Sequence, residues 1–115
     1  MDLKMRTREA KDITIIDLTG RLTMGESCKA LRDEVHDELG QENKKILLNL
    51  ADVTYIDSAG LGELTSAFMS VKNRGGALKL VNLTKRVHDL MQITKLYTVF
   101  EVFDDEKTAL ASFGA

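Results

Sequence analysis

The chain has 115 residues, of which 43% are hydrophobic and 30% charged, and its formal net charge at pH 7 is −2. This size and composition predict one compact globular domain spanning residues 1–115, and they exclude disordered and collagen-like chains. The near-balanced charge argues against a protein whose main task is to neutralise a nucleic-acid backbone. We therefore expect no direct nucleic-acid partner.

The rare residue types exclude further classes of protein. The single cysteine, Cys28, cannot form an internal disulfide, and two scattered histidines, His36 and His88, hardly supply a metal site. No apolar run approaches the ~20 residues that span a bilayer, and the first ten residues lack a signal-peptide core. The expectation is a cytoplasmic protein with no membrane contact, no metal ion and no cofactor.

Three strands are predicted in the first half of the chain. Apolar and polar residues alternate over 3–8, and β-branched residues dominate 13–18, which favours an antiparallel hairpin. Residues 46–50 are mostly apolar, the pattern of a central strand covered on both faces.

A helix is predicted between the hairpin and the central strand. Thr23 and Glu26 have the spacing of a capping box, and Gly40 is placed to end the helix. Its expected buried stripe is Cys28, Leu31, Val35 and Leu39. Its expected solvent-facing acids are Asp33, Glu34, Asp37 and Glu38.

The second half predicts the same alternation of helices and strands. The expected helix, strand, helix and strand cover residues 61–71, 78–82, 84–94 and 99–103. Thr84 is placed to cap the third helix, and Asp104 to cap a short final helix. That final helix should pack inward through Ala109, Leu110 and Phe113. Strands that alternate with helices indicate an α/β domain in which helices face a sheet.

The segment from Asp52 to Gly62 joins the central strand to the second helix and carries the strongest functional signal. Small residues at 58–60 and 62 let another molecule approach the backbone, and a helix N-terminus favours a nearby anion. A phosphate on Ser58 would add about −1.5 to −2 charges beside Asp57, a change that a partner could read. The alternative is that Ser58 only caps the helix and the glycines only serve a turn.

Three active-site interpretations of this segment are less well supported. A hydrolase nucleophile elbow requires glycine where Ile56 stands, and no catalytic histidine can be assigned. A nucleotide-binding loop requires a third glycine, or a Gly-Lys-Ser/Thr motif, and neither is present. A receiver domain phosphorylated on Asp57 is the stronger rival, although the first two strands supply only Asp17 toward the acidic magnesium site.

The segment from Lys72 to Arg86 is locally basic. Its cations are Lys72, Arg74, Lys79, Lys85 and Arg86. Such a run is typical of a solvated face, and it can also steer a charged partner toward the surface.

The sequence from Asp57 to Gly62, preceded by an apolar strand and by residues 52–56, closely resembles the signature of STAS domains of the anti-sigma factor antagonist type. Residues 20–22, 75–81 and 96–103 follow in that family's order, so the resemblance spans nearly the whole chain. It implies a single STAS-like α/β domain with a mixed sheet and helices mainly on one face.

The resemblance also implies a function without catalysis by this chain. An unmodified antagonist captures an anti-sigma factor and thereby releases a sigma factor. A serine kinase activity in the anti-sigma factor then phosphorylates the antagonist, and a serine phosphatase restores it. Any nucleotide would be used by the kinase partner.

Carried over position by position, the family's phosphorylated serine falls on Ser58. The expected partner-binding residues are Thr23, Asp57, Ser58, Ala59, Gly60, Leu61 and Gly62. Thr23 departs from the acidic residue that many relatives have, which puts the identity of the partner in question. A receiver domain, or a structural STAS module in a larger signalling assembly, remains the alternative.

Overall fold

The computed structural model describes residues 3–114, which form one five-stranded sheet with its strands in chain order. The strands are β1 (Leu3–Ala10), β2 (Ile13–Leu22), β3 (Lys45–Ile56), β4 (Ala77–Val81) and β5 (Val102–Phe103). The hairpin strands β1 and β2 are antiparallel, as predicted, and the pairs from β2 to β5 are parallel. The helices are α1 (Glu26–Gly40), α2 (Ser58–Asn73), α3 (Lys85–Thr94), the 3-10 turn η1 (Leu96–Thr98) and α4 (Glu106–Ala111).

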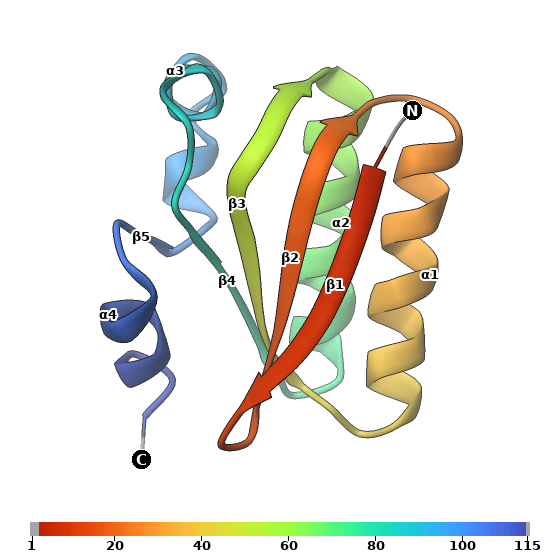
Figure 1. The fold of residues 1–115 in the computed structure, drawn as a ribbon, viewed down its shortest axis with the longest axis vertical. Helices are drawn as coiled ribbons and strands as arrows, with labels where there is room; N and C mark the ends of the chain where they lie inside the picture. The colour runs from red at the N-terminus through yellow and green to blue at the C-terminus, as the bar shows by residue number, and fades with distance from the viewer. Residues whose placement is uncertain (1–2, 115) are drawn as a thin grey trace.

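The helices lie mainly on one face of the sheet, which confirms the predicted fold class. Helices α1 and α2 stand side by side on that face (Figure 1). The buried stripe of α1 and two residues of α3, Val87 and Met91, belong to the same core cluster. Alternate residues of the central strands, such as Ile15 and Leu47, point to the other face and pack with Ala109 of α4. No helix within residues 3–114 is both long and apolar enough to cross a membrane.

Two cations fasten the short α4 to the sheet. The Arg8 guanidinium pairs with Asp17 at 2.7 Å and with Glu106 of α4 at 2.6 Å. Lys79 is only 8% exposed, and its ammonium donates to the carbonyl and the hydroxyl of Ser112 at 2.8 and 3.0 Å. The end of the chain is therefore held by specific polar bonds as well as by apolar packing.

The predicted capping box at Thr23 is wrong. Gly25, at φ +105°, turns the chain, so that α1 begins at Glu26 without any side-chain cap. The backbone N–H and carbonyl of Thr23 instead pair with the hydroxyl of Ser27, at 2.8 and 2.7 Å. Thr23 therefore shapes the loop before the helix through its backbone.

Of the other two predicted helix caps, one is confirmed and one is wrong. Thr84 caps α3 as predicted, because its hydroxyl accepts from the Val87 amide at 3.3 Å. Asp104 does not cap α4; Asp105, one residue later, accepts from the Thr108 amide at 2.8 Å. That capping bond places the start of α4 at Glu106.

One predicted strand and one predicted solvent-facing residue also differ from the structure. The last strand was predicted over 99–103, but only Val102–Phe103 pairs with β4, because Phe100 follows a 3-10 turn and packs edge-on against Phe68. Glu38 was expected to face solvent, yet it is 7% exposed and accepts a hydrogen bond from Asn43. Burial raises the pKa of Glu38.

Candidate functional site

The candidate site lies where β2 and β3 end at the same edge of the sheet. Residues 52–56, expected between the strand and the helix, belong to β3 because they pair with the end of β2, and Ile56 lies opposite Leu22. One residue, Asp57, separates β3 from α2. The loop that follows β2, residues 23–25, therefore lies beside the first turn of α2.

The Asp57 carboxylate bonds to both the loop 23–25 and the first turn of α2. One of its carboxylate oxygens accepts from the Gly60 amide at 2.8 Å, which makes Asp57 the N-cap of α2. The other oxygen accepts from the Met24 amide at 3.0 Å. The hydrogen bonds from Met24 and Gly60 lower the pKa of Asp57, since both favour the charged carboxylate.

Ser58 is the first residue of α2, so the alternative in which Ser58 is the helix cap is wrong. Its side chain is exposed, and its hydroxyl makes no hydrogen bond to any residue between 3 and 114. Asp57 already performs the capping role, which leaves the Ser58 hydroxyl free to react. The Ser58 hydroxyl is therefore accessible without any change in the helix cap.

Gly60 allows α2 to start directly against β2. A Cβ atom at this position would collide with the Leu22 carbonyl oxygen and lie 2.8 Å from Cγ1 of Ile56. Gly62, two residues later, is exposed and has nothing within 4 Å of its own Cβ position. The two glycines of the motif therefore have different roles, one in packing and one on the open surface.

The remaining predicted partner-binding residues differ in accessibility. Thr23 and Ala59 are half-buried, whereas Leu61 is 6% exposed and belongs to the main core. Met24, whose amide donates to Asp57, is 78% exposed. Met24, Ser58 and Gly62 are thus exposed, and Thr23, Asp57 and Ala59 contribute partly to the accessible surface of the site.

Comparison with known protein families identifies the domain, because the model of the STAS domain matches residues 4–109. The chain belongs to the STAS domain family. The anti-sigma-B factor antagonist of Bacillus subtilis is 29% identical over 102 residues, covering 89% of this chain and 92% of the relative.

Solved structures agree with this assignment of the STAS fold. A Thermotoga maritima protein assigned as an anti-sigma factor antagonist has a TM-score of 0.88 and 26% identity, with 95% of this chain and 93% of that chain covered. The Bacillus cell-fate determinant SpoIIAA in its phosphorylated form has a TM-score of 0.73 and 17% identity, with 95% and 98% covered, and it supports the fold alone. The resemblance seen in the sequence is confirmed.

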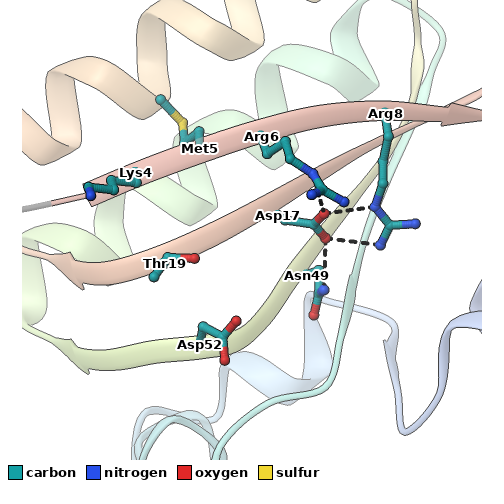
Figure 2. A pocket seen from close by; sticks show the side chains of 8 residues that line it. All are labelled: Lys4, Met5, Arg6, Arg8, Asp17, Thr19, Asn49 and Asp52. Carbon is teal, nitrogen blue, oxygen red and sulfur yellow. Dashed lines mark hydrogen bonds and ion pairs between the residues drawn. The ribbon is translucent and has the colours of Figure 1, made fainter.

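The STAS domain also carries a polar hollow, with a volume of about 330 Å³, on the face of the sheet opposite α1 and α2. Figure 2 shows its lining side chains, Lys4, Met5, Arg6, Arg8, Asp17, Thr19, Asn49 and Asp52. At its centre Asp17 accepts hydrogen bonds from Arg8 and from Asn49, at 2.7 and 2.8 Å. These bonds satisfy the Asp17 carboxylate within the domain.

The position of Asp17 bears on the receiver alternative. Asp17 pairs with Asn49 of β3, and Asn49 precedes Asp57 by eight residues. Along an extended strand this corresponds to a separation of roughly 25 Å. The acid that a receiver would need beside Asp57 is therefore distant from it. Residues 3–114 contain no group of three His, Cys, Asp or Glu side chains positioned to hold a metal ion.

Proposed function

We propose that this STAS domain is a phosphorylation-controlled anti-sigma factor antagonist. In its unphosphorylated form it captures an anti-sigma factor and so releases a sigma factor. The observation that supports this most directly is the exposed hydroxyl of Ser58, on a helix start that is held in place by Asp57. Membership of the STAS family and the 29% identical anti-sigma-B factor antagonist support the same proposal.

The switch acts through charge on an unchanged fold. Asp57 is ionised near neutral pH, since its ordinary pKa of 3.8 is already acidic and its two amide bonds lower that pKa further. A phosphate on Ser58 adds about −1.5 to −2 charges next to this carboxylate. Because Asp57 already accepts from the Gly60 and Met24 amides, the phosphate adds its charge at an exposed position without displacing the cap.

The proposed partners are those that the family resemblance implies. The anti-sigma factor supplies the serine kinase activity and uses the nucleotide, and a serine phosphatase removes the phosphate. The chain, acting as one domain over residues 1–115 in the cytoplasm, is the substrate and contributes no catalytic group or cofactor. Thr23, Asp57 and the segment 58–62 form the surface that the partner contacts or that positions those contacts.

Substitution of Ser58 tests the proposal. The anti-sigma factor is recovered with the wild-type protein from the source cells, identified by mass spectrometry and purified. Ser58→Ala should keep the stability and bind the purified partner within about twofold of wild type, because Asp57, and not Ser58, caps α2. Ser58→Asp should weaken binding about tenfold or more through like-charge repulsion.

Ser66→Asp is the matched control, since Ser66 is exposed on the same helix two turns further on. It should bind like wild type. Equal affinity for wild type, Ser58→Ala and Ser58→Asp would contradict the switch. Incorporation of phosphate from acetyl phosphate and magnesium into Asp57, in an alkali-labile bond, would instead support a receiver.

A further inference from the structure

Two arginines lie against one tyrosine ring at the edge of the sheet that carries Ser58. The guanidinium of Arg21, near the end of β2, is 5.3 Å from the centre of the Tyr55 ring, and that of Arg86, in the first turn of α3, is 5.4 Å from it. All three side chains are exposed. Three separate elements thus bring two positive charges to one aromatic surface.

Neither arginine has a carboxylate within ion-pair distance among residues 3–114, in contrast to Arg8, Arg32 and Lys85. Arg8 and Arg32 pair with Asp17 and Glu63, at 2.7 and 2.8 Å. Lys85, next to Arg86, pairs with Asp89 at 2.9 Å. Two guanidiniums gathered on one ring repel each other, and neither forms an ion pair within residues 3–114, although the Asp52 carboxylate lines the same hollow as Arg86.

This Arg21–Tyr55–Arg86 cluster lies close to the proposed switch. Tyr55 precedes Ser58 by three residues, so their Cα atoms are at most about 11 Å apart. Arg86 also lines a mainly apolar hollow with Asp52, Thr54 and Thr84, in which the aliphatic stem of a side chain can rest. A partner that docks over Ser58 would therefore also cover the cluster.

We propose that the Arg21–Tyr55–Arg86 cluster binds an acidic side chain of the anti-sigma factor, an inference that rests on the proposed function. Guanidinium groups bind carboxylates in a planar, two-pronged geometry, and the ring of Tyr55 holds both groups in place before the partner arrives. A phosphate on Ser58 presents a competing anion at the same edge. The cluster thus links partner recognition to the phosphorylation state.

Neutral substitutions of the two arginines test this proposal. The measurement is the kinetics of binding to the anti-sigma factor, recovered and purified as described for the Ser58 variants. Arg21→Gln and Arg86→Gln should each weaken binding about 3- to 10-fold near 50 mM NaCl, mainly through slower association, and the double variant should weaken it further. The loss should shrink near 500 mM NaCl, because salt screens exposed charges. Thermal stability should remain that of wild type.

Two further variants separate the role of the ring from a general charge effect. Tyr55→Phe, which keeps the ring, should bind like wild type, whereas Tyr55→Leu should weaken binding about as much as one arginine substitution. Lys107→Gln, an exposed lysine on α4, removes the same charge elsewhere and should bind like wild type.

The outcomes distinguish this proposal from the proposed function. Binding of the double arginine variant within twofold of wild type, or an equal loss in Lys107→Gln, would overturn the role of the cluster and leave the switch standing. Failure of wild-type protein to bind any anti-sigma factor would overturn both.

Discussion

Substitution of Gly60 with alanine is expected to destabilise the domain by about 3 kcal/mol, because the new methyl group overpacks a closely fitted contact. Its Cβ would meet the Leu22 carbonyl oxygen and Ile56 Cγ1, and the carbonyl belongs to a strand end that cannot easily yield. The same carbonyl also accepts the Asp57 amide at 3.3 Å. Urea denaturation measures the loss in the free energy of unfolding.

Gly62→Ala is the matched control, two residues along the same helix. Nothing lies within 4 Å of its Cβ position, and alanine favours a helix over glycine, so the domain should gain up to about 1 kcal/mol. Equal effects of the two substitutions would show that α2 does not start against β2 as the structure has it.

Substitution of Asp57 with asparagine is expected to remove one of the two bonds that the carboxylate accepts, because an amide has a single acceptor oxygen, and to lower the melting temperature by about 5 °C near neutral pH. The bonds from Met24 and Gly60 depress the pKa of Asp57 below its ordinary value of 3.8. A depressed pKa stabilises the fold above that ordinary value, and the stabilisation is lost as pH falls through the lower folded value. The gap between wild type and Asp57→Asn should therefore be constant above about pH 5 and shrink below about pH 4.

Asp105→Asn provides a control for the general effect of removing a helix-capping carboxylate. Asp105 caps α4 through the Thr108 amide and hydroxyl, and the bonds of its carboxylate stay within that helix. This substitution should leave binding of the anti-sigma factor unchanged, whereas Asp57→Asn should weaken it. Thermal melts over pH 3 to 7 and binding measurements check both expectations. A stability gap for Asp57→Asn that widened in acid would contradict the assigned bonds.

Much of the fold could be predicted from local patterns. The order of strands and helices and the buried stripe of α1 follow from apolar spacing, which depends on neighbours in sequence. The helix start at Glu26 and the cap at Asp105 were missed because turn geometry, set by Gly25 in the first case, decides between adjacent candidates. The length of β3 depends on its pairing with β2, which no local pattern contains.

The candidate site was predicted in part for the same reason. The motif from Asp57 to Gly62 is contiguous, so it could be found in the sequence. The bond from the Met24 amide to Asp57 joins residues 33 positions apart, and the approach of Arg21 and Arg86 to one ring depends on three elements meeting in space. The burial of Glu38 and Lys79 likewise depends on tertiary packing.

The most direct test of the proposed switch compares the wild-type protein with the same protein fully phosphorylated on Ser58, each titrated calorimetrically with the purified anti-sigma factor. The phosphorylated form is expected to bind at least about 100-fold more weakly, with an unchanged circular dichroism spectrum and melting temperature, because phosphate alters surface charge and not the fold. Equal affinity of the two forms, or a loss of affinity that coincides with unfolding, would contradict this account.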